Sequence, residues 1–145
     1  MASILKVDEL QGIASAGAIT VTSEGGSATQ SLQQGLAKAW VNMNATGTTS
    51  PASTTGVRDS FNVASILDIA DGGQTVNLSN SMSNADYAFT VNERNTTTIR
   101  AWCNGGNPQH SDPSTSAFDV AAFNEGSLAY MDPNWIWAVV HGDLA

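Results

Sequence analysis

The segment that decides the fold is Trp135-Ile-Trp-Ala-Val-Val140, close to the end of the chain. Successive side chains of a β-strand point to opposite faces, so tryptophans and valine alternate with a second apolar set. Both faces are apolar, as expected for a strand that is covered on both sides. We expect one apolar face to pack in the core and the other to contact another subunit. Burial of both faces within one chain is an adequate alternative explanation. The candidate oligomer-interface residues are Trp135, Ile136, Trp137 and Val140.

Upstream of this strand, short β-type segments recur between turns rich in Gly, Asn and Asp. Gln74-Thr-Val-Asn-Leu78 alternates and follows Asp71-Gly-Gly73, a typical hairpin turn signal. Strands at intervals of roughly 8–12 residues favour a sandwich or a barrel. We therefore predict an all-β fold, an antiparallel, jelly-roll-like β-sandwich with an extended N-terminal strand arm. The predicted strands are 57–64, 66–69, 74–78, 87–91, 96–103, 116–124 and 135–140.

The first 26 residues contain two short β-type stretches, 3–8 and 18–22, separated by small residues. They hold too few apolar side chains to build a core of their own. We predict that residues 1–26 form a docking arm that completes its pairing by adding a strand to another chain. The predicted docking side chains are Ile4, Leu5, Val7 and Leu10.

Residues 27–56 are predicted to form a strand plus a flexible linker, ahead of a β-sandwich domain at 57–145. Leu32, Leu36 and Trp40 recur at a spacing that fits a helix, whereas the stretch 36–41 also fits the period of a strand. We favour the strand from Leu36 to Val41. The following run 44–56 is rich in Thr, Ser, Ala and Gly, which predicts an exposed loop or linker.

Composition excludes several classes of partner. Charged residues make up 12% of the chain, the net charge is −8, and the five basic residues are scattered. Without a basic patch, binding to nucleic acid or to an anionic membrane surface is disfavoured. The single cysteine rules out a disulfide within the chain. We expect no secretion signal and no membrane span, since no apolar run reaches the required length.

Signals for catalysis are nearly absent. His110 and His141 belong to no zinc-ligand spacing, and no nucleophile elbow, phosphate loop or dinucleotide motif is present. The candidate carboxylate pairs are Asp68/Asp71 and Asp112/Asp119. A structural role explains them better than catalysis, since Asp68 and Asp71 belong to a hairpin turn, where Asp is favoured for local hydrogen bonding. No stretch matches a calcium loop of the EF-hand type, although loop oxygens with one or two Asp are able to hold an ion. We predict no enzyme activity, no catalytic residue, no cofactor and no dedicated metal site.

A sugar-binding site is the more serious alternative. Trp102 borders the loop 104–114, which supplies amide and carboxylate groups beside an aromatic ring. An inward-facing Trp102 in a strand is the competing explanation. The candidate glycan contacts are Trp102, Asn104, Asn107, His110 and Asp112.

Several phrases of the sequence together resemble the virion structural proteins of marine and cyanobacterial tailed phages, of the tail-fibre, spike or capsid-appendage type. The phrases that carry the resemblance are Ser3-Ile-Leu-Lys-Val-Asp-Glu-Leu10, Ala18-Ile-Thr-Val-Thr-Ser-Glu-Gly-Gly26, Leu36-Ala-Lys-Ala-Trp-Val-Asn42, Arg58-Asp-Ser-Phe-Asn62, Thr75-Val-Asn-Leu78 with Met82, Ala85-Asp-Tyr87 and His141-Gly-Asp-Leu144.

This resemblance covers most of the chain and says least about residues 93–134. It implies a bacteriophage structural protein, usually a homotrimer, that is made in the host cytoplasm and joins the virion without catalytic residues. Its partners would be copies of itself and phage capsid or tail proteins. Capsid decoration or cement and a short tail fibre both fit. The alternatives are a host-attachment protein that recognises a surface glycan and, more distantly, a glycan-degrading enzyme.

Overall fold

The computed structural model describes residues 5–12, 19–22, 26, 28–94, 99–102, 112–124 and 129–145. The chain divides into two units, residues 1–36 and residues 37–145, and each is described by itself. Within the described residues, no helix has the length and apolar character that crossing a membrane requires.

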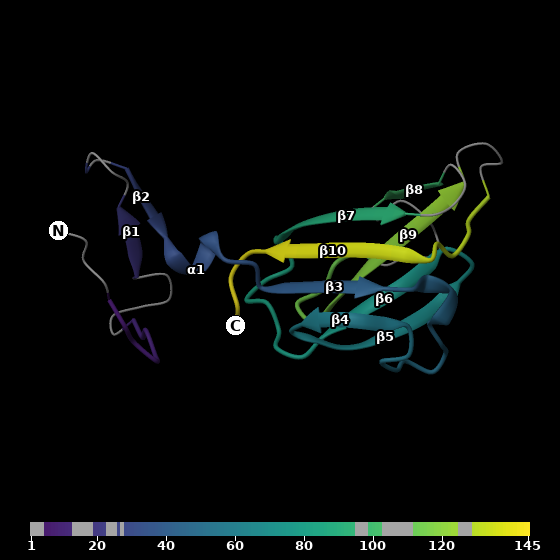
Figure 1. Cartoon of the computed structure of the whole chain (residues 1–145), viewed down its shortest axis with the longest axis horizontal. Coiled ribbons are helices and arrows are strands. Elements are labelled where there is room, and N and C mark those ends of the chain that lie inside the picture. Colours follow the sequence, from purple (N-terminus) through teal and green to yellow (C-terminus); the bar gives the residue numbers. More distant parts are fainter. Residues whose placement is uncertain are drawn as a thin grey trace. The chain divides into compact units, whose positions relative to one another are not determined.

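The second unit consists of two four-stranded antiparallel sheets (Figure 1). The first sheet has the order β4-β3-β10-β7 and the second the order β5-β6-β9-β8. Buried side chains from both sheets form one cluster, so the sheets pack in a sandwich-like arrangement. The prediction of a mostly β fold with antiparallel sheets is confirmed. The strands are β3 (Ala39–Met43), β4 (Val57–Phe61), β5 (Val63–Ala70), β6 (Gly73–Leu78), β7 (Ala88–Arg94), β8 (Ile99–Trp102), β9 (Ala117–Asn124) and β10 (Trp135–His141).

In the first sheet, the core is built by strict alternation along the inner strands β3 and β10. In β10 the side chains of Ile136, Ala138 and Val140 are buried, while the residues between them are only half-buried. β3 follows the same period and pairs with β10, so Val41 lies directly opposite Ala138. The predicted two faces of the final strand are therefore confirmed. The buried cluster comprises Ala39, Val41, Met43, Ala45, Ile66, Val76, Leu78, Met82, Tyr87, Phe118, Val120, Ile136, Ala138 and Val140.

The hairpin turn predicted after β5 is also confirmed, since β5 and β6 pair up to Ala70 and Gly73. Gly72 adopts a φ of +72° in this turn. A Cβ atom there would collide with the backbone oxygen of Ala122 and lie 2.7 Å from the nitrogen of Met131. Only glycine fits this position, on grounds of both backbone angle and space.

The strand expected within residues 27–56 belongs to the sandwich. β3 falls inside the segment 27–56, yet it is an inner strand between β4 and β10. Residues 44–56 form a loop with fixed contacts, because the Asn44 N–H donates to the oxygen of Gly56 at 2.8 Å and Ala45 is buried. Ser53 also forms an antiparallel bridge with Ile66 of β5. The loop packs on the sandwich because its buried backbone groups need partners.

The first unit holds one small hairpin and one helical turn. β1 (Thr20–Thr22) pairs with β2 (Thr29–Ser31), and α1 (Leu32–Gly35) follows directly. The Ser31 hydroxyl caps α1 by accepting from the Gln34 N–H at 3.4 Å. The helical and the strand pattern that were weighed for residues 32–41 are thus both present in part. The helical turn comes first, and the strand β3 lies later than the predicted 36–41. The described residues 5–12 form neither helix nor strand, and none of the described residues of this unit is buried.

Candidate interaction surface

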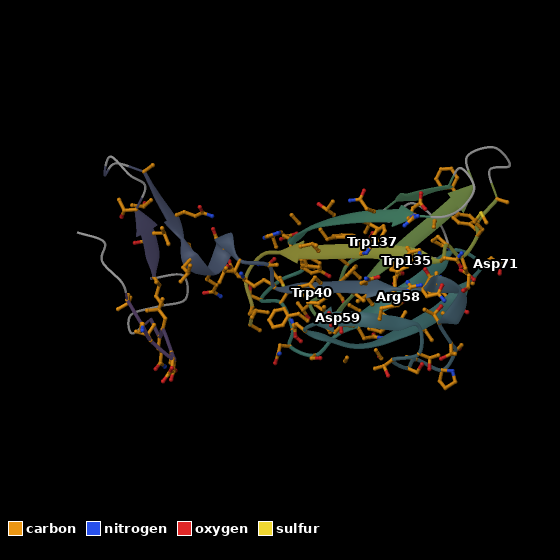
Figure 2. The ribbon with its side chains drawn as sticks, viewed as in Figure 1. Trp40, Arg58, Asp59, Asp71, Trp135 and Trp137 are labelled. Carbon is orange, nitrogen blue, oxygen red and sulfur yellow. The ribbon has the colours of Figure 1, made fainter. Side chains whose placement is uncertain are left out.

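The outward side of the first sheet gathers aromatic side chains from three strands. Trp135 and Trp137 lie two positions apart on β10, and Trp40 on β3 pairs in register with Val139 beside them. Phe61 on β4 lies directly opposite Trp40. Figure 2 shows the three tryptophans on this one sheet, together with two charged residues of β4. We call this surface the tryptophan face and define it by Trp40, Arg58, Asp59, Phe61, Trp135 and Trp137.

Two of the rings of the tryptophan face, Trp135 and Trp137, pack on each other. The Trp135 and Trp137 ring centroids are 5.9 Å apart with an interplanar angle of 25°. The guanidinium carbon of Arg58 lies 3.6 Å from the centroid of the Trp135 ring, a distance typical of a cation–π contact. These contacts leave the two indoles half-buried although they face outward. The result is a rigid aromatic surface of the kind that is enriched at protein interfaces.

A bulge between β3 and β4 places Arg58 on this surface. Asn42 is paired with Asp59, but the next pair is Met43 with Val57, so Arg58 is the extra residue. A bulge of this type re-aims a side chain that simple alternation would place elsewhere. The face therefore carries a positive and a negative group side by side at its β4 edge, Arg58 and Asp59.

The structure separates the four predicted interface residues into two sets. Ile136 and Val140 have no exposed surface within the single chain, because they point between the two sheets. They offer no surface to a partner within the single chain, and the oligomer interface itself stays a prediction. Trp135 and Trp137 face outward and keep exposed surface.

The predicted docking side chains lie in the first unit. Leu5 is 80% exposed, and Val7 and Leu10 are both 56% exposed. Ile4 lies outside the described residues. Val21 of β1 and Leu36 after α1 are exposed to a similar degree, although the sequence pattern did not single them out.

The candidate glycan contacts are only partly covered by the described residues. Trp102 is the last residue of β8, but its side chain is outside what the structure describes. Asn104, Asn107 and His110 are outside it as well, together with most of the loop 104–114. Asp112 is exposed.

Sequence reasoning missed several polar side chains that are buried in the sandwich. Lys38, Gln74 and Asp119 all have little exposed surface. Asp119, weighed above as half of a carboxylate pair, accepts a hydrogen bond of 2.6 Å from the Thr75 hydroxyl. Burial lowers the pKa of Lys38, against an opposing effect of the charge on Asp143. Gln74 is in phase with the buried Val76 and Leu78, so the alternation of 74–78 was a local signal for its burial. Lys38 and Asp119 have no such signal.

Neither a metal site nor a similarity to known proteins assigns a function to the described residues. Across the described parts of the chain, no group of three or more His, Cys, Asp or Glu side chains is arranged to hold a metal ion. No protein-family model, curated protein or solved structure matches the chain. Function is therefore inferred from the geometry of the chain and from the resemblance described above.

Proposed function

We propose that the chain is a structural subunit of a phage virion, a homotrimeric β-rich appendage docked to the particle by its N-terminal arm. Capsid decoration or cement and a short tail fibre are the two roles that fit. The observation that carries the proposal is the exposure of Leu5, Val7 and Leu10 in a unit with no buried residue among those described. Apolar side chains without a core of their own gain free energy when a partner covers them.

Docking by an arm suits this unit for a second reason. An extended segment that pairs with another chain binds through its backbone and places alternate side chains in pockets of the partner. Leu5 and Val7 are two residues apart and have the alternation that this mode requires. The partner is a phage capsid or tail protein.

The tryptophan face supports association with copies of the same chain. Each copy has a net charge of −8, so copies repel one another unless their contact is apolar or balanced in charge. The face meets both conditions, since it joins three tryptophans with Arg58 next to Asp59. Aromatic residues and arginine are the residue types that most often dominate binding at interfaces.

The jelly-roll-like topology belongs to the same proposal. Its support is that β3 and β10, the first and last strands of the sandwich, are neighbours in one sheet. Such pairing brings the first and last strands of the sandwich side by side within one sheet. No enzymatic step is proposed.

A pair of matched variants tests the arm. Replacing Leu5, Val7 and Leu10 with Ser should abolish incorporation into particles, while the purified protein keeps its oligomeric mass and melting temperature. Replacing Lys6, Asp8 and Glu9 with Ser in the same segment is the control and should leave incorporation unchanged. Full occupancy of particles by the apolar-to-Ser variant would contradict the docking role.

A further inference from the structure

A polar cluster lies where β5 turns into β6. Asp68 and Gln74 are direct partners across these two strands, next to the buried pair Ile66 and Val76. Since alternate positions share a face, Asp68 and Gln74 also point towards the interior of the sandwich. Asp132, just before β10, joins them through the side chain of Gln74.

The hydrogen bonds of Asp132 fix the orientation of the Gln74 amide. Asp132 Oδ1 accepts from the Gly72 N–H at 2.7 Å and from Gln74 Nε2 at 2.9 Å. A carboxylate only accepts, so the amide nitrogen must face Asp132. The Gln74 oxygen is then an acceptor that needs a different partner in the same cluster.

Within the part of the chain that the structure describes, two oxygens of the cluster have no hydrogen-bond partner. Gln74 is fully buried, and neither its Oε1 atom nor the Oδ1 atom of Asp68 makes a hydrogen bond. A buried acceptor left without a donor destabilises the folded state, and more strongly when the group is charged. Both atoms are acceptors, so they are unable to satisfy each other while Asp68 is ionised.

The charges around these oxygens have one sign. Burial raises the pKa of Asp68, and the nearby charges of Asp132 and Asp71 raise it further. Asp71 belongs to the turn between the two strands and is exposed, as Figure 2 shows at the end of the sandwich. Asp68 is therefore influenced by two further carboxyl groups, while its own Oδ1 and the Gln74 Oε1 have no hydrogen-bond donor among the described residues.

We propose that Asp68, Gln74 and Asp132 form a binding site for a divalent cation, and that the cation is Ca²⁺. A cation in contact with both free oxygens would satisfy them at once and balance the surrounding carboxylates. The described residues provide no ready set of three acidic ligands, so this site depends on the amide oxygen of Gln74 and on water. Mixed carboxylate, amide and water ligation is characteristic of Ca²⁺, which accepts 6–8 oxygens in flexible geometry.

Other metals fit less well. The cluster offers no sulfur and no imidazole, the ligands that favour zinc and copper. Mg²⁺ requires near-ideal octahedral geometry and loses its water reluctantly, whereas Gln74 is held rigidly by Asp132. The competing state is a neutral Asp68, whose hydroxyl would donate to the amide oxygen without any metal.

Calorimetric titration of the chelator-treated full chain with CaCl2, and separately with MgCl2, distinguishes these states. We expect one Ca²⁺ per chain with a dissociation constant below about 1 mM, weaker Mg²⁺ binding, and a rise in melting temperature with Ca²⁺. Asp68→Asn should weaken Ca²⁺ binding by about tenfold or more, while Asp86→Asn, an exposed carboxyl elsewhere, should not change it.

Two results would overturn the site. One is a wild-type chain with no Ca²⁺ binding heat and an unchanged melting temperature, which would assign Asp68 to the neutral state. The other is Ca²⁺-induced NMR shifts that leave the Gly72 amide and the Gln74 side-chain amide unaffected, which would place any bound ion elsewhere. Shifts centred on those two groups, lost in Asp68→Asn, support the site.

Discussion

The guanidinium group of Arg58 lies against the indole of Trp135, with 3.6 Å between the guanidinium carbon and the ring centroid. The two residues belong to strands that are not neighbours, since β3 runs between β4 and β10. Arg58 reaches across because it is the extra residue of a bulge. This contact joins the edge strand of the sheet to its central aromatic pair.

Replacing Arg58 with Ala should lower the free energy of unfolding by about 0.5–1 kcal/mol, the usual contribution of an exposed cation–π contact. Arg58→Lys should fall between Ala and the wild type, because an ammonium group stacks less well on an indole. Urea unfolding at one fixed protein concentration, followed by tryptophan fluorescence, measures the difference. Equal stability of Arg58→Ala and the wild type would show that the contact contributes nothing.

Replacing Trp137 with Ala should convert the proposed homotrimer to monomers while leaving the sandwich folded, since the ring faces away from the core. Light scattering coupled to size-exclusion chromatography gives the mass, and circular dichroism checks the fold. Tyr130→Ala removes another exposed aromatic ring outside the tryptophan face and serves as the control. If Trp137→Ala remains trimeric, the tryptophan face is not the contact between copies.

Replacing Ile136 with Ala should lower the stability of the fold, whereas Trp137→Ala should change the oligomeric mass. Ile136 is fully buried, so the substitution should lower the free energy of unfolding by about 2–5 kcal/mol through lost burial and a cavity. The milder Ile136→Val should cost only about 0.5–1.5 kcal/mol. Chemical denaturation of both variants tests the assignment, and a small effect of Ile136→Ala would mean that the side chain does not face the core.

Tyr87 makes stability depend on pH in the alkaline range. Burial, with a smaller effect from Asp119, raises the pKa of the Tyr87 hydroxyl from 10.0 to about 12. The unfolded chain ionises this phenol from about pH 10, while the folded chain keeps the proton until higher pH. Because the folded state then binds more protons than the unfolded state, stability should fall as the pH rises from 10 towards 12.

Tyr87→Phe isolates this contribution. The hydroxyl lies 2.9 Å from the backbone oxygens of both Ser114 and Ala117, so its loss should cost about 1 kcal/mol near neutral pH. The difference in stability between wild type and variant should shrink between pH 10 and pH 12, as measured by urea unfolding at each pH. A difference that stays constant over this range would rule out the raised pKa.

The elements with a clean period of two could be predicted from the sequence. β10 is the best example, because Ile136 and Val140 alternate with Trp135 and Trp137 and are indeed buried. The β5–β6 hairpin is another, because its turn requires glycine at position 72. In both cases the signal is local, since neighbouring residues along the chain decide which side each side chain takes.

The contacts of the loop 44–56 could not be predicted from the sequence. Its composition is typical of a linker, yet Ala45 is buried and its N–H donates to the Pro133 oxygen at 3.1 Å. Pro133 is far away in the sequence, so nothing within the loop indicates this contact. The same holds for Gln74, whose partner Asp132 is equally distant along the chain.

The alternation of apolar and polar residues established strands, antiparallel sheets and the inward side of β10, because side-chain direction in a strand follows from backbone geometry alone. It left open which outward side chains meet. The contact of Arg58 with Trp135 depends on a bulge and on the order of three strands, and the Asp68, Gln74 and Asp132 cluster depends on the packing of distant segments. Those relationships exist only after the sheets have formed, because they join residues that chain connectivity keeps apart.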